Sequence, residues 1–161
     1  MLDQPKATHL YLDDRNLGTL AGRACGSSMS GSSEAAPLLR VDQDHVGHRA
    51  VVTAVGEVDL SSTAKLGKAI EAARERGASE IWLDFTCTTF MDCAGLRTLC
   101  EARARLIEEE RRLVLICPPG AVLRLLTLTG LDRVLEIHRT RSAARASITT
   151  SSAHDRTPVQ P

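Results

Sequence analysis

The sequence predicts a single mixed α/β domain in which helices cover a partly parallel β-sheet. Short apolar runs of strand length alternate with segments whose apolar residues recur at helical spacing, in the order β-β-α-β-α-β-α-β. With 161 residues, one domain with a sizeable core is expected. We place it at residues 37–139, between a disordered N-terminal arm (1–36) and a disordered C-terminal tail (140–161), because both ends are rich in small polar residues and lack periodicity.

The first two strands are predicted at residues 38–42 and 49–55, joined by a polar turn as in a hairpin. His45 and His48 in this turn have a spacing seen in metal sites. No cysteine or carboxylate cluster completes such a site, so we assign them no metal. Residues 56–60, with the sequence Gly-Glu-Val-Asp-Leu, end the second strand.

The first helix is expected to begin after Ser61 or Ser62, which are both good caps, and to end at Gly77. Its apolar face is formed by Leu66, Ala69, Ile70 and Ala73. The next strand, residues 81–85, is a near-continuous apolar run, which is typical of a strand buried on both faces of a parallel sheet.

The second helix is predicted to begin at Asp92, a good N-cap that closely follows Phe90 at the end of a β-rich segment. The expected apolar stripe consists of Leu96, Leu99, Cys100, Leu106 and Ile107, interrupted by Arg103. A strand at 113–117, a short helix at 121–129 and a last strand at 134–137 complete the predicted order.

Composition argues against several function classes. The formal net charge is zero, and one tryptophan, one tyrosine and two phenylalanines offer few stacking surfaces, so nucleic-acid binding is not expected. No apolar run reaches the ~20 residues of a membrane span and no signal peptide is evident, so we expect a cytoplasmic protein. Five cysteines are an odd number, which suits reduced thiols, and we read Cys87, Cys100 and Cys117 as small buried apolar residues.

No enzymatic chemistry is indicated. The chain has no phosphate-binding glycine loop, and Cys93 has no evident base, because nothing in the sequence places His138 near it. We therefore expect no enzyme and no cofactor. Asp59, Asp84 and Asp92 lie at or near strand ends, and if the strands are parallel neighbours, these ends share the edge of the sheet where binding sites form.

Four segments in this order resemble the STAS domain of bacterial anti-sigma factor antagonists: residues 56–60, 83–85, 90–96 and 128–131. The resemblance implies the STAS-like mixed sheet and a non-enzymatic protein, monomeric when free. It also implies the partner, an anti-sigma factor that is commonly a serine/threonine kinase of the histidine-kinase-like ATPase fold. Binding that partner frees a sigma factor for transcription.

The resemblance also implies a docking site, at Asp59, Asp92, Cys93 and Ala94 with the helix from Gly95 and Leu96 onward. In the family, the kinase phosphorylates a serine directly after the aspartate, and the phosphorylated form releases the partner. Here Cys93 and Ala94 occupy the two positions usually held by serines, so the chain offers no hydroxyl there.

Three hypotheses about control follow. We rank first an antagonist that is always competent and is controlled by its abundance. Oxidation of Cys93 comes second: a helix start favours the thiolate, but the neighbouring Asp92 opposes it. Phosphorylation of Thr88 or Thr89 comes third.

The alternative function is a STAS scaffold or small-ligand-binding module in a stress-sensing or transport-associated assembly. A redox-responsive thiol switch is more remote.

Overall fold

The computed structural model describes residues 39–151, and within them the predicted order of strands and helices is confirmed. The strands are β1 (Arg40–Val46), β2 (Arg49–Val58), β3 (Glu80–Met91), β4 (Arg112–Ile116) and β5 (Glu136–His138). The helices are α2 (Thr63–Glu75), α3 (Cys93–Glu108), α4 (Ala121–Leu128) and α5 (Arg141–Ser151), with a 3-10 turn, η1 (Leu131–Arg133), after α4. The predicted N-terminal arm and the last ten residues of the predicted tail lie outside the described residues.

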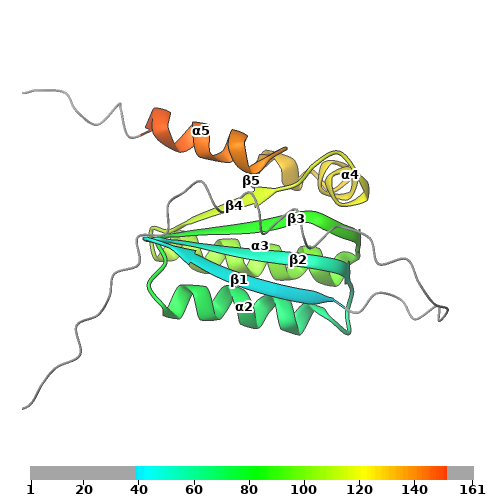
Figure 1. Cartoon of the computed structure of the whole chain (residues 1–161). Helices are drawn as coiled ribbons and strands as arrows, with labels where there is room; N and C mark the ends of the chain where they lie inside the picture. Colours follow the sequence, from blue (N-terminus) through cyan, green and yellow to red (C-terminus); the bar gives the residue numbers. More distant parts are fainter. Residues whose placement is uncertain (1–38, 152–161) are drawn as a thin grey trace, which may run out of the picture. The chain divides into compact units, whose positions relative to one another are not determined.

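Within the described residues, the strands form one five-stranded sheet in the order β1-β2-β3-β4-β5 (Figure 1). β1 and β2 form the predicted antiparallel hairpin, and β2 through β5 are parallel neighbours. The hairpin turn is shorter than predicted because Gly47, at φ +60°, allows a tight turn that keeps Val46 paired with Arg49. His45 therefore lies in β1 and not in the turn.

The two faces of the sheet are covered by different helices (Figure 1). Alternate side chains of β2, β3 and β4 pack with α2, α3 and α4 into the larger core cluster. On the opposite face, four sheet residues form a second cluster with Ala144 of α5. These four are Val51, Trp82, Val114 and Ile116. Both faces are thus buried where α5 lies, as the apolar run at 81–85 predicts.

The prediction that the chain is disordered from Thr140 is wrong for residues 141–151, which form α5. Three alanines favour a helix here, and the buried Ala144 adds apolar contact with the sheet. Arg141 anchors the start of the helix through an ion pair with Asp84 of β3. The folded domain therefore extends beyond the predicted boundary at Arg139.

Two details of the predicted elements also differ. β3 is longer than 81–85, because its threonine-rich continuation stays paired with β2 through two register shifts. On α3, Cys100 and Ile107 are exposed, while Leu99, Ala102 and Leu106 face the core. The inward stripe passes through the small residue Ala102, which a search for large apolar residues overlooks.

Candidate functional site

The strands β2 and β3 end side by side at one edge of the sheet. Val58 pairs with Met91, and the Asp92 N–H donates to the Val58 carbonyl at 3.0 Å. Since the two strands are parallel, the segments that follow them, beginning with Asp59 and Asp92, emerge at the same edge. We call the surface formed by Asp59, Leu60, Phe90, Asp92, Cys93 and Ala94 the Asp92 edge.

Asp92 holds this edge together through both of its carboxylate oxygens. Oδ1 accepts hydrogen bonds from the backbone N–H groups of Ala94 (2.8 Å) and Gly95 (3.0 Å), so Asp92 caps α3 as predicted. Oδ2 accepts from the N–H of Leu60 at 3.0 Å. One side chain therefore fixes both the start of α3 and the loop that follows β2.

Asp59 organises that loop. Its Oδ1 accepts hydrogen bonds from the Ser61 hydroxyl (2.7 Å) and from the N–H groups of Ser61 (3.0 Å) and Ser62 (2.9 Å). The hydrogen bonds from the Ser61 and Ser62 side chains are the main cause that holds the pKa of Asp59 below its ordinary value. Asp59 is consequently ionised at neutral pH, and it shapes the turn.

The residues at the start of α3 differ in accessibility. The Cys93 thiol is exposed and Ala94 is half-buried, whereas Gly95 and Leu96 are buried. Gly95 and Leu96 thus face the core, and the accessible part of the predicted docking site at this helix start is Cys93 with Ala94.

Gly95 allows the close approach of α3 to the ends of β2 and β3. A Cβ at this position would lie 2.7 Å from Met91 Cγ and 3.0 Å from Val58 Cγ1. We expect Gly95→Ala to lower the free energy of unfolding by roughly 1–2 kcal/mol, because overpacking outweighs the gain in helix propensity. Urea denaturation monitored by circular dichroism measures this change.

Gly67→Ala in α2 is the matched control for that substitution. Its Cβ would meet only Thr98 Cγ2, at 3.8 Å, so we expect a stabilisation of about 0.5–1 kcal/mol from helix propensity alone. If both alanine variants are equally stabilised, the close approach at Gly95 is not what requires glycine.

Two threonines precede the edge on β3. The Thr88 hydroxyl donates to the Ala54 carbonyl at 2.9 Å and is half-buried. Thr89 is exposed, and its hydroxyl makes a longer hydrogen bond of 3.4 Å to the Gly56 carbonyl. Thr89 is therefore the more accessible of the two hydroxyls.

The sequence reasoning missed two residues of the edge. Leu60 is 78% exposed and Phe90 is 46% exposed, although each adjoins a strand end rich in core residues. The exposure of Leu60 could have been inferred from its place in the turn Asp-Leu-Ser-Ser, because Leu60 belongs to no periodic apolar pattern there. For Phe90, the polar threonine pair before it marked a stretch of β3 that is not buried.

The cysteines occupy different environments. Cys117 is buried as predicted, and burial raises the pKa of its thiol to about 11, so it stays protonated at neutral pH. Cys87 is only half-buried and Cys100 is exposed, so the prediction that all three are buried holds for Cys117 alone. Among the residues described, no side chain forms a hydrogen bond or ion pair with the Cys93 thiol.

Asp84 does not belong to the Asp92 edge. It lies inside β3, 3% exposed at its side chain, where Arg141 Nε approaches its Oδ2 to 2.5 Å. The same guanidinium donates through Nη2 to the Thr53 hydroxyl at 3.1 Å. Asp84 therefore attaches α5 to the sheet, and of the three aspartates predicted to share one edge only Asp59 and Asp92 do so.

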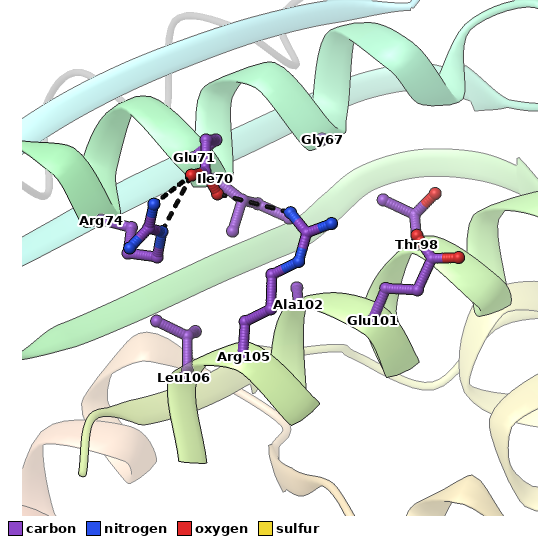
Figure 2. Close-up of a pocket in the computed structure, with 9 residues that line it drawn as sticks. All are labelled: Gly67, Ile70, Glu71, Arg74, Thr98, Glu101, Ala102, Arg105 and Leu106. Atoms are coloured by element: carbon purple, nitrogen blue, oxygen red, sulfur yellow. Dashed lines mark hydrogen bonds and ion pairs between the residues drawn. The ribbon is translucent and has the colours of Figure 1, made fainter. Parts of the chain in front are cut away.

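A small hollow of about 50 Å³ lies between α2 and α3 (Figure 2). Glu71 lies between Arg74 and Arg105 there, and pairs with both; Arg105 Nη1 is 3.6 Å from Glu71 Oε2. Ligand pockets are typically about 300–1,000 Å³, so this hollow is too small for a metabolite. The ion pair between Arg105 and Glu71 joins the two helices.

Two features are absent from residues 39–151. No three side chains of histidine, cysteine, aspartate or glutamate come together as a metal site would require. None of the helices there has the length and apolar character needed to cross a bilayer.

A family model described as "Mlab, STAS domain" matches residues 41–136 of the chain. The match covers β2, β3 and the whole Asp92 edge. It ends at Glu136, before α5 begins.

Similar proteins carry related names. The anti-sigma-B factor antagonist of Listeria monocytogenes is 28% identical over 96 residues, which are 60% of this chain and 81% of that protein. An anti-sigma factor antagonist from Mycobacterium paratuberculosis has the same fold, with a TM-score of 0.64 and 22% identity over 69% of this chain and 94% of that one. The phosphorylated form of SpoIIAA from Bacillus also has this fold, with a TM-score of 0.54 and 21% identity over 68% of this chain and 99% of that one.

Proposed function

Because the chain belongs to the STAS domain family, we propose that it is a cytoplasmic anti-sigma factor antagonist, which binds an anti-sigma factor and so releases a sigma factor. The names of the Listeria relative and of the mycobacterial structure support this function. The order of the four sequence segments, from Gly56 to Leu131, supports it independently of these names.

The observation that carries the proposal is the Asp92 edge. A capped helix start, a fixed loop and exposed apolar side chains make a surface suited to binding another protein. A thiol nucleophile needs a base within hydrogen-bonding reach. Among the described residues, no side chain bonds the Cys93 thiol, and this favours binding over catalysis as the role of the edge.

The proposed partner is an anti-sigma factor of the kinase type, with the histidine-kinase-like ATPase fold. Cys93 occupies the place of the phosphorylated serine, so this partner has no hydroxyl to modify there, and we propose an antagonist controlled by its abundance. Oxidation of the exposed Cys93 thiol ranks second, and phosphorylation third. For the third hypothesis, the geometry favours Thr89 over Thr88, because Thr89 is exposed and its hydroxyl makes the longer hydrogen bond to β2.

The proposal is tested by titrating the full chain into each purified anti-sigma factor encoded in the same genome and measuring heats of binding. One of them is expected to bind in a 1:1 complex with micromolar or tighter affinity. If none binds, the proposed function is wrong. Binding instead to a component of a transport or stress-sensing assembly would favour the scaffold alternative.

Cys93→Ser tests the assignment of the partner as a kinase. We expect this variant to take up phosphate from ATP when it is mixed with the partner, because the substitution supplies a hydroxyl directly after Asp92 at an exposed position. Intact-mass spectrometry detects the added phosphate, and the wild-type chain is expected to remain unmodified.

Cys100→Ser is the matched control, since Cys100 is also exposed on α3 but does not follow the capping aspartate. Phosphate on both serine variants, or on neither, would argue against the proposed correspondence of Cys93 with the phosphorylated serine.

A further inference from the structure

Two large apolar side chains stand out at the Asp92 edge. Leu60 follows Val58 by two residues, and Phe90 directly precedes Met91, the residue paired with Val58. The two residues therefore lie at the same end of the β2–β3 pair. Leu60 and Phe90 are both exposed, so each offers apolar contact area, and neither is among the docking residues suggested by the sequence.

The backbone of both residues is held in place before any partner binds. The Leu60 N–H donates to Asp92 Oδ2, which ties the loop to the capped start of α3. Phe90 lies in β3, where it is paired with Glu57 of β2. A backbone that is already ordered loses little conformational entropy on binding, so these residues are suited to be anchors.

Three acidic residues lie on the segments that carry Leu60 and Phe90. Glu57, Asp59 and Asp92 lie at or beside the edge, and within residues 39–151 none of them takes part in an ion pair. The hydrogen bonds to Asp59 and Asp92 come from backbone N–H groups and serine hydroxyls, which leave the net negative charge in place. A basic partner surface is the electrostatic complement of this edge.

We propose that Leu60 and Phe90 are the anchor residues of the Asp92 edge, and that they fit an apolar pocket flanked by lysine or arginine on the anti-sigma factor. This inference rests on the proposed function and specifies the chemistry of the partner's surface. Asp59 and Asp92 serve mainly to position the anchors, because Asp59 Oδ1 and both carboxylate oxygens of Asp92 already accept hydrogen bonds from their own chain.

The first test compares the affinities of three alanine variants for the anti-sigma factor that binds the wild-type chain. Leu60→Ala and Phe90→Ala are each expected to weaken binding by about tenfold or more, as anchors in other interfaces do. Ile107→Ala is the matched apolar control, because Ile107 is 52% exposed but lies near the opposite end of α3 from Cys93. It is expected to leave the affinity within about twofold of wild type.

The charge is tested by Glu57→Lys, with Glu108→Lys at the far end of α3 as its control. We expect only Glu57→Lys to weaken binding, by roughly fivefold or more at low salt and by less at high salt. Wild-type affinity in both alanine variants would overturn the anchor assignment while leaving the proposed function intact. If the wild-type chain binds no anti-sigma factor, the proposed function fails and the anchor assignment fails with it.

Discussion

Asp84→Ala is expected to lower the free energy of unfolding by about 2–4 kcal/mol and to release α5 from the sheet. The substitution leaves the Arg141 guanidinium without its carboxylate at a largely buried position, and it also removes the acceptor of the Thr86 N–H at 2.8 Å. Removing one partner of a buried ion pair costs more than the pair itself contributes, because the remaining charge stays desolvated. Urea denaturation measures the loss, and hydrogen exchange of the α5 amides measures the release.

Asp42→Ala provides the control for this substitution. Asp42 pairs with Arg40 at the exposed edge strand β1, where an ion pair contributes only about 0.2–1 kcal/mol. Equal destabilisation by the two substitutions, with α5 exchange unchanged in Asp84→Ala, would mean that Asp84 does not attach the helix.

Asp92→Ala is expected to cost roughly 2–3 kcal/mol of stability and to abolish measurable partner binding. Three backbone N–H groups lose their acceptor, at the start of α3 and at Leu60. The loop that carries Leu60 is then no longer held against the helix start. Denaturant unfolding and calorimetric titration with the partner measure the two effects separately.

Asp92→Asn separates the cap from the loop attachment. The amide oxygen of the introduced asparagine can still accept hydrogen bonds from the N–H groups of Ala94 and Gly95. The amide nitrogen would instead face the Leu60 N–H, and no hydrogen bond forms there because both groups are donors. We expect this variant to keep most of the stability but to bind the partner several-fold more weakly. Wild-type affinity in Asp92→Asn would show that the bond to Leu60 is not needed for docking.

Much of the fold follows from local patterns. The alternation of apolar runs with helical segments predicts the element order, and the cap at Asp92 is evident from an aspartate before a helical period. These features depend on neighbouring residues, which is why the sequence alone predicts them. The element that was missed, α5, has a polar and alanine-rich composition, and only its attachment to Asp84 and the sheet makes it part of the domain.

The sequence predicts where the backbone segments of the site lie, but it does not predict which side chains the site exposes. The position of Asp92 beside Asp59 follows from two parallel strands that end together. The bond from Asp92 to Leu60 joins residues 32 positions apart and depends on the register of β2 with β3, which no local pattern specifies. Leu60 and Phe90 were missed because apolar residues at strand ends usually belong to the core.

The most direct test of the account is a reconstituted transcription assay with purified RNA polymerase, the sigma factor and the anti-sigma factor that binds this chain. Adding the anti-sigma factor should stop transcription from the sigma-dependent promoter. Adding the wild-type chain in equimolar amount should restore it, while the Phe90→Ala variant should restore it only at several-fold higher concentration. Transcription that stays inhibited at saturating concentrations of the wild-type chain would contradict the proposed function.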